Sequence, residues 1–326
     1  MTAIHQRVRK LSTGVAMGYL EAGPETGRPV VLLHGFTDSG FAWAPVMRQI
    51  ASLDPSLRLF ALHQRGALGT ALPDCDTCRQ QPSHCITNAE HVEDVIAFLI
   101  EMDLGPTLLV GHSMGSMVAR GVALARPDLV DKLVLVATPG PRPAGRIGLA
   151  GITAFHPDDD IADSEPVKSF RAIAQTRGIV WPQGAFDLSP IDLDPFAVHR
   201  LLEGWVASTL ADPAVLRETA ERTARVPLKY WGIDRTPVDG PAEHLEDLRV
   251  PTLAIWGVQD TLMTEEMQKD LCAALDAASH RNSAMHYTWK QYGSIACSPG
   301  EPQTDFGHEL VAEAPNELAR DIVSFL

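Results

Sequence analysis

Short apolar runs recur along the first half of the chain and once more near its end. Each is four to six residues long, which is too short for a buried helix and typical of a strand that is buried on both faces. The runs occupy residues 30–33 (VVLL), 57–62 (LRLFAL), 107–110 (TLLV), 132–137 (KLVLVA) and 251–256 (PTLAIW). They predict a set of parallel strands.

Segments between these runs have the spacing of amphipathic helices. The segments starting at Thr87 and Met114 each place their apolar residues on one face: Val92, Val95, Ile96 and Leu99 in the first, and Met114, Met117, Val118 and Val122 in the second. Strands that alternate with helices predict an α/β fold in which helices make the crossovers.

The alternation stops after Ala137 and resumes at Pro251. The intervening segment is rich in proline, glycine and acidic residues, including the stretch HPDDD. We therefore interpret residues 140–247 as an inserted lobe, and residues 1–139 and 248–326 as one core domain.

Composition narrows the range of partners. The chain has 326 residues, of which 45% are hydrophobic and 21% charged, as in ordinary soluble globular proteins. A formal net charge of -14 repels nucleic acid and anionic membranes, so we expect neither as a partner and favour a small neutral or apolar substrate. The chain shows no signal-peptide pattern and no long apolar run, which predicts a cytoplasmic protein.

A serine stands between two glycines where the run at 107–110 gives way to a helical pattern. In the stretch GHSMG, Ser113 lies between Gly111 and Gly115. A serine on a sharp turn from strand to helix holds its hydroxyl clear of the backbone, and the glycines avoid collisions with neighbouring elements. The pattern predicts that Ser113 is a nucleophile at a nucleophile elbow.

With this motif in place, the chain resembles the α/β-hydrolase fold superfamily, in particular its serine esterases and lactonases. The resemblance rests on four stretches in the family's order: LLHGF at 32–36, VGHSMG at 110–115, IWGVQD at 255–260 and DFGHEL at 305–310. It implies an eight-stranded, mostly parallel sheet flanked by helices, a helical cap inserted after the sixth strand, and a Ser-Asp-His catalytic triad. The chain departs from the family in HQRGALGT, which lacks the usual acidic residue after the fourth strand, and in the length of the segment before His308.

A serine hydroxyl needs a base within hydrogen-bond reach, and a neutral imidazole suits that role near pH 7. Among 12 histidines, His308 follows a glycine before the terminal helix, in a loop on the strands' carboxyl side, where ligands bind in open α/β sheets. The alternative is a surface histidine near the C-terminus. We interpret His112, next to the nucleophile, as structural, and His34 as packing or as support for the oxyanion loop.

The base needs a carboxylate to hold its tautomer. Asp260 follows the last apolar run after a glycine, and its alternative role is to cap a helix that starts near Thr264. Asp305 is the second candidate. For the oxyanion hole we predict the backbone N–H groups of Phe36 and Met114, because Met114 opens a helix whose first amides are unpaired.

One cluster, DCDTCRQQPSHC, contains cysteine and histidine, the residue types that most often bind zinc in proteins. Cys75, Cys78, His84 and Cys85 offer three thiolates and an imidazole, but their spacing is irregular for a zinc ribbon. Three interpretations remain: solvent-facing or weakly packed thiols, which we favour, a disulfide such as Cys75–Cys85, or a metal site. We expect no metal and no cofactor. Cys272 and Cys297 are isolated in the sequence.

Together these features predict a hydrolase that cleaves carboxylic esters or lactones of a medium-sized hydrophobic substrate through an acyl-enzyme, with the triad Ser113, Asp260 and His308. The alternatives are a cofactor-free haloperoxidase, an amidase or a C–C bond hydrolase with the same triad, or a non-catalytic small-molecule binding protein. A dehalogenase or epoxide hydrolase of this fold would carry aspartate in place of Ser113.

Overall fold

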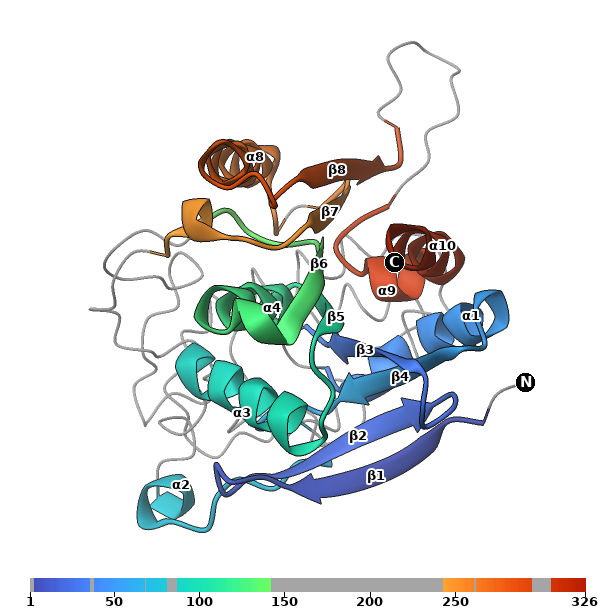
Figure 1. Ribbon diagram of the computed structural model, residues 1–326, viewed down its shortest axis with the longest axis vertical. Helices are drawn as coiled ribbons and strands as arrows, with labels where there is room; N and C mark the ends of the chain where they lie inside the picture. Colours follow the sequence, from blue (N-terminus) through green and yellow to red (C-terminus); the bar gives the residue numbers. More distant parts are fainter. Residues whose placement is uncertain are drawn as a thin grey trace, which may run out of the picture.

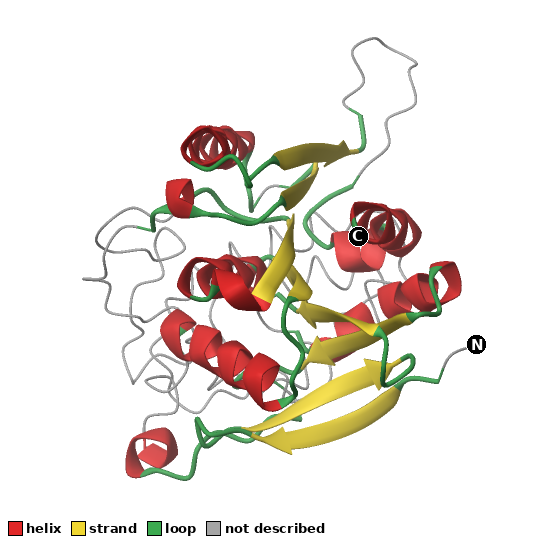
Figure 2. Cartoon of the chain, in the orientation of Figure 1, coloured by secondary structure: helices red, strands yellow, loops and turns green. Residues whose placement is uncertain are grey.

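A computed structural model describes residues 3–35, 38–67, 69–80, 87–141, 243–260, 262–294 and 306–326. Within these residues the chain forms one sheet with helices on both of its faces (Figures 1 and 2). The strands and helices are β1 (His5–Lys10), β2 (Ala16–Ala22), β3 (Arg28–Leu33), η1 (Gly40–Trp43), α1 (Ala44–Leu53), β4 (Leu57–Leu62), α2 (Asp76–Gln80), α3 (Asn88–Glu101), β5 (Thr107–His112), α4 (Met114–Ala125), η3 (Pro127–Leu129), β6 (Val130–Val136), η6 (Leu245–Asp247), β7 (Thr252–Gly257), α8 (Glu265–Arg281), β8 (Tyr287–Tyr292), α9 (Leu310–Glu313) and α10 (Pro315–Phe325).

The predicted eight-stranded, mostly parallel sheet is confirmed. Its strand order is β1-β2-β4-β3-β5-β6-β7-β8; β1 and β2 are antiparallel to their neighbours, and all strands from β4 to β8 run parallel. The order reverses between β3 and β5, because the chain passes from β3 outward to β4 and then returns to β5. In open α/β sheets such a switch point opens a crevice at the carboxyl ends of the strands, where ligands bind.

The five predicted strands are β3, β4, β5, β6 and β7, and the two predicted helices are α3 and α4. Helix α3 begins where the sequence places a capping box: the Thr87 side chain accepts from the Glu90 N–H, and the Glu90 carboxylate accepts from the Thr87 N–H. β1, β2 and β8 were not predicted from the apolar pattern. β1 and β8 lie at the two edges of the sheet and are more polar, so their sequences carry no continuous apolar run. β2 lies between β1 and β4 and is largely buried, but Gly18 and Glu21 interrupt its apolar residues.

Alternate residues of the central strands supply two hydrophobic layers. Val31 and Leu33 of β3 belong to the layer under α3, α4 and α8, whereas Val30 and Leu32 belong to the layer under α1 and α10. Figure 1 shows these helices on opposite faces of the sheet. Burial on both faces explains why the central strands read as uninterrupted apolar runs.

The predicted cap at 140–247 lies almost wholly outside the described residues, and its structure stays a prediction. The described chain leaves β6, reaches residue 141, and resumes at residue 243 before β7. At this junction the buried Arg120 of α4 donates to the carbonyl oxygens of Pro139 (2.7 Å) and Gly140 (3.1 Å), and its Nε lies 2.7 Å from a carboxylate oxygen of Glu243. Arg120 therefore joins both described ends of the segment to the helix that follows Ser113.

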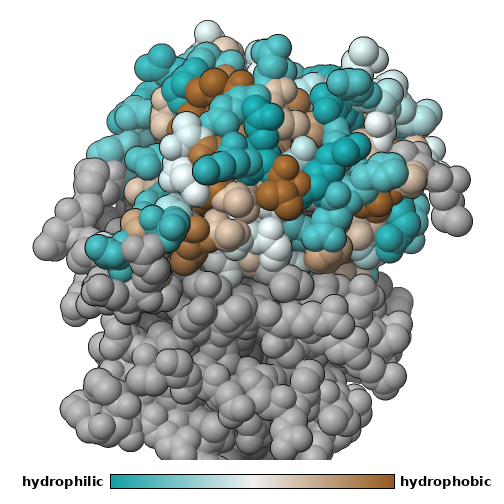
Figure 3. All heavy atoms as spheres, turned by 90° about the horizontal axis from the view of Figure 1, so that it is seen from below, coloured by the Kyte–Doolittle hydropathy of each residue, from teal (hydrophilic) through white to brown (hydrophobic). Residues whose placement is uncertain are grey.

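The described surface is mixed in character. Seen from below, hydrophobic residues lie scattered among hydrophilic ones (Figure 3). The exposed large hydrophobic side chains among the described residues are Val8, Leu53, Ile100 and Met267, which belong to four different elements. None of the helices in the described part of the chain combines the length and the apolar character needed to cross a bilayer.

Candidate active site

Ser113 lies at the switch point, on a tight turn between β5 and α4. Its backbone has φ 51° and ψ -119°, a conformation that non-glycine residues rarely adopt and that costs about 1–3 kcal/mol. A Cβ on Gly111 would collide with the Gly115 carbonyl, and a Cβ on Gly115 would collide with the backbone after β3. The two glycines are thus required by close packing around the turn.

His308 and Asp260 complete a chain of hydrogen bonds with Ser113. His308 Nε2 lies 2.8 Å from Ser113 Oγ, and His308 Nδ1 lies 2.8 Å from Asp260 Oδ2. All three residues are buried, with relative exposures of 8%, 3% and 5% for Ser113, His308 and Asp260. A carboxylate only accepts, so Nδ1–H of His308 donates to Asp260, which leaves Nε2 to face the serine hydroxyl.

Asp260 is held by further bonds. Its Oδ1 accepts from the backbone N–H groups of Leu262 (2.9 Å) and Met263 (2.8 Å), in the loop after β7. Thr264, not Asp260, is the N-cap of α8, because its side chain accepts from Met267 N–H. Asp305 lies outside the described residues. The structure therefore brings together Ser113, His308 and Asp260, and the alternative capping role of Asp260 is wrong.

Two opposing effects act on the pKa of His308. Burial alone lowers it, but the adjacent Asp260 carboxylate, with smaller contributions from Glu309 and Glu313, outweighs burial and raises the pKa of His308 to about 9. The imidazole therefore holds a second proton more tightly than an exposed histidine does.

Of the two predicted oxyanion donors, Met114 lies within the described residues and Phe36 does not. Met114 is the first residue of α4, so its N–H lies among the helix amides that have no partner within the helix. Phe36 lies outside the described residues, although its neighbour Gly35 packs against the turn: a Cβ there would lie 3.2 Å from Ser113 Cβ. The residues before position 36 thus lie directly beside the serine.

His112 and His34 hold backbone near the site, as expected for structural histidines. His112 Nε2 donates to the carbonyl of His308 at 2.8 Å, and its ring centroid lies 5.1 Å from that of His308. His34 Nε2 accepts from Gln64 N–H at 3.0 Å, while the Gln64 side chain donates back to the His34 carbonyl at 2.7 Å. His34 therefore ties the loop after β3 to the loop after β4.

The stretch HQRG, where the usual acidic residue is missing, has its own interactions. His63 Nδ1 accepts from Gly40 N–H at 3.1 Å, and Arg65 makes two hydrogen bonds to the carboxylate of Asp94 on α3, at 2.7 and 2.8 Å. The side chains of Arg65 and Asp94 are only 4% and 1% exposed. A buried ion pair thus anchors the loop that supports His34.

The cysteine cluster is described only in part. Cys75 is partly exposed and Cys78 is buried, and Cys78 N–H lies 3.2 Å from Cys75 Sγ. Of the favoured interpretation, solvent-facing or weakly packed thiols, burial excludes the solvent-facing form for Cys78, which lies in the middle of α2. His84, Cys85 and Cys297 lie outside the described residues, so the disulfide and metal interpretations stay predictions. Cys272 is free and half-buried.

Among the described residues, one group of side chains of the kinds that bind metal ions lies within the site. Ligand atoms of His112, His308 and Glu309 lie within 4.8 Å of one another. Both ring nitrogens of His308 and Nε2 of His112 already bond to protein atoms. We therefore assign no metal to this cluster.

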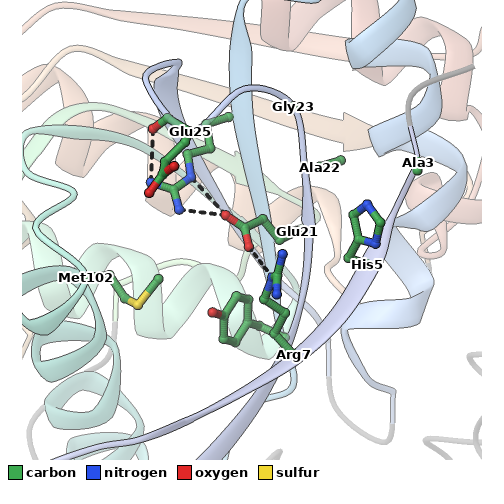
Figure 4. Close-up of a pocket in the computed structure, with 10 residues that line it drawn as sticks. Ala3, His5, Arg7, Glu21, Ala22, Gly23, Glu25 and Met102 are labelled. Carbon is green, nitrogen blue, oxygen red and sulfur yellow. Dashed lines mark hydrogen bonds and ion pairs between the residues drawn. The ribbon is translucent and has the colours of Figure 1, made fainter.

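A surface pocket lies away from these residues, against β1 and β2 and the first residues of β4 (Figure 4). Glu21 lies in it between two guanidinium groups, accepting from Arg7 at 2.7 Å and from Arg58 at 2.6 and 2.9 Å. Arg58 lies at the amino end of its strand, whereas Ser113 follows the carboxyl end of β5. This pocket therefore lies at the amino ends of the parallel strands, and the candidate site lies at their carboxyl ends.

Two site neighbours were not singled out in the sequence, Arg120 and Glu313. Glu313 contacts the His308 loop: its Oε2 accepts from Gly307 N–H at 2.6 Å. A carboxylate five residues after the candidate base was a visible signal. Arg120 had none, because its partners lie far along the chain.

Comparison with known proteins gives the same fold. A family model described as the alpha/beta hydrolase fold matches residues 28–162. Cis-3-alkyl-4-alkyloxetan-2-one decarboxylase of Xanthomonas campestris pv. campestris is 32% identical over 126 residues, 38% of this chain and 41% of that protein. Epoxide hydrolase 4 of Homo sapiens is 31% identical over 139 residues, 42% of this chain and 35% of that protein. The matched segments thus span about two fifths or less of these relatives.

A solved structure matches over a greater length. The enol-lactonase from Burkholderia xenovorans LB400 superposes with a TM-score of 0.63 and 15% identity, covering 98% of this chain and 99% of that one. At this identity the likeness shows a shared fold.

Proposed function

We propose that this chain, which has the α/β-hydrolase fold, is a serine hydrolase of carboxylic esters or lactones with medium-sized hydrophobic substrates. The observation that carries the proposal is the run of hydrogen bonds from Ser113 through His308 to Asp260, each 2.8 Å long, at the sheet's switch point. Such a run activates a serine hydroxyl for attack on a carbonyl.

The proposed reaction has two halves. Ser113 Oγ attacks the carbonyl carbon while His308 Nε2 takes the hydroxyl proton, and Asp260 stabilises the imidazolium that forms. The negative charge on the carbonyl oxygen is stabilised by the N–H of Met114, with Phe36 N–H as the proposed second donor. His308 then protonates the leaving alkoxide, and water, activated by the same imidazole, hydrolyses the acyl-enzyme.

The chemistry at the turn favours esters and lactones over epoxides. A serine stands where an epoxide hydrolase of this fold would carry an aspartate, so the similarity to Epoxide hydrolase 4 does not carry its activity to this chain. The oxetan-2-one named for the relative from Xanthomonas is a cyclic ester, and one structural neighbour is an enol-lactonase. The aromatic residues in the sequence at 140–247 favour an apolar substrate, with that segment roofing the site as a cap.

A panel of substrates tests the proposal. We expect turnover of p-nitrophenyl esters and lactones, little cleavage of anilides, and a single phosphonate adduct on Ser113 by intact-mass measurement. Ser113→Ala protein is the matched control and should show neither turnover nor adduct. Cleavage of β-diketones without esters would move the assignment to C–C bond hydrolysis, and an unlabelled, inactive protein would favour a binding role.

The rate should depend on pH through His308. An imidazolium cannot accept the Ser113 proton, so kcat/KM should rise with pH as His308 loses its extra proton. Because the Asp260 carboxylate outweighs burial and raises the pKa of His308 to about 9, we expect the midpoint of this rise to lie above neutrality. A series of kcat/KM measurements from about pH 5 to 10 checks this; a flat profile would contradict a histidine base.

A further inference from the structure

The peptide groups on both sides of His308 are held by the side chains of His112, which is buried, and Glu313, which is partly buried. His112 donates to the His308 carbonyl at 2.8 Å, and Glu313 Oε2 accepts from the N–H of Gly307 at 2.6 Å. The carbonyl of Phe306 accepts from Gln259 N–H at 2.9 Å, in the loop that leads to Asp260. Glu313 thus belongs to the set of contacts that place the base relative to its carboxylate.

An amide would serve this backbone contact as well as a carboxylate does. Only Oε2 of Glu313 receives the bond from Gly307; Oε1 is buried and has no hydrogen-bond partner among the described residues. A buried polar atom without a partner costs free energy whether it is this oxygen or the amide nitrogen that glutamine would place there. The property that distinguishes Glu313 from glutamine at this position is its negative charge.

Opposing effects act on the charge of Glu313. Burial raises the pKa of Glu313 to about 8 and so disfavours its ionised form, while the Gly307 N–H and the His308 imidazolium act in the opposite direction. The groups that act on it are His308 and Glu309, which precede α9, and Asp260 acts on the same imidazole.

The elements packed against α9 add few other charges. η1 has none, the Arg48 side chain of α1 is exposed, and in α10 Glu317 and Asp321 pair with Arg320 and Lys290. Among the groups that act on the pKa of Glu313, His308 is the one that can carry a positive charge.

We propose that Glu313 is a positioning residue that holds the His308 loop and, as a second, partly buried carboxylate, stabilises the imidazolium formed when His308 takes the Ser113 proton. The inference rests on the proposed function, because it assigns His308 the role of base. In the active form His308 is neutral and Glu313 ionised, so the developing positive charge meets two carboxylates rather than one.

Three variants separate charge from position. Glu313→Gln keeps an acceptor for Gly307 and removes the charge, so the midpoint of the kcat/KM profile should move about 1 pH unit lower. Glu313→Asp keeps the charge but is one methylene shorter, so the midpoint should stay and kcat should fall about tenfold. Glu317→Gln removes an exposed carboxylate of α10 and is the matched control, with no change expected.

A titration without turnover distinguishes this inference from the proposed function. NMR of histidine-labelled protein follows the His308 imidazole directly, with the signal assigned from His308→Gln. A lower midpoint in Glu313→Gln than in wild type supports the inference even if no ester is cleaved. Equal midpoints would overturn it, even if Ser113 reacts with a phosphonate as proposed; if Glu313→Gln does not fold, a lowered midpoint in Glu313→Asp would overturn it equally.

Discussion

Replacing Ser113 by alanine is expected to lower kcat by roughly four to six orders of magnitude while the protein stays folded. The loss is large because the hydroxyl is the proposed nucleophile. Without it, His308 Nε2 loses the group that lies 2.8 Å away and whose proton it would accept. His308→Ala should cost about as much, because residues that act as one unit are not additive. Ester hydrolysis and far-ultraviolet circular dichroism of each variant check activity and fold.

The acid is tested by a matched pair. Asp260→Asn should cost less than Ser113→Ala, about four orders of magnitude, because it disturbs the tautomer of His308 but leaves the nucleophile. Asp305→Asn, three residues before His308, should leave turnover close to wild type. The opposite result, with Asp305→Asn inactive and Asp260→Asn active, would refute the assignment of the acid.

Asp94→Ala is expected to lower the free energy of unfolding by about 3–5 kcal/mol. The change removes the partner of Arg65, whose side chain is 4% exposed and which makes two hydrogen bonds to Asp94 at 2.7 and 2.8 Å. Arg65 then keeps a buried charge without this partner, and its ion pair with Glu90 is longer, at 3.3 Å, with the Glu90 side chain 30% exposed. Urea unfolding of wild type and variant measures the difference.

An exposed ion pair supplies the control for this prediction. Glu317→Ala breaks the contact with Arg320, whose side chain is 61% exposed, and should change the stability by less than about 1 kcal/mol. If Asp94→Ala were equally mild, other contacts would hold the loop that contains Arg65. The Arg65–Asp94 ion pair would then not be what anchors the HQRG stretch.

Local patterns predicted the central layer of the fold. A strand buried on both faces must be apolar throughout, so β3 to β7 could be recognised without any partner in view. The first turn of helix α3 has a local signal in Thr87 and Glu90, because the side chain of each accepts a hydrogen bond from the backbone N–H of the other. The strands β1 and β8 could not be recognised in this way, because they are the edge strands of the described sheet and their side chains are largely exposed.

The site was predictable in so far as each residue has a local signal. Ser113 stands between glycines at a strand end, His308 follows a glycine before a helix, and Asp260 follows the strand β7. What sequence alone left open was which carboxylate meets the imidazole. That choice depends on the distance between two loops whose residues Asp260 and His308 are 48 positions apart in the sequence.

The sequence by itself determined the strand and helix alternation, the strained turn at Ser113 and the nature of the groups at the carboxyl ends of the strands, because each follows from neighbours within one or two turns of chain. Only the tertiary structure decided how those ends meet. It placed Asp260 beside His308, turned His112 toward the His308 carbonyl, and brought the Glu313 carboxylate to the N–H of Gly307. These contacts depend on the parallel register of β5, β6 and β7 and on the packing of α9 beside them, which no local pattern encodes.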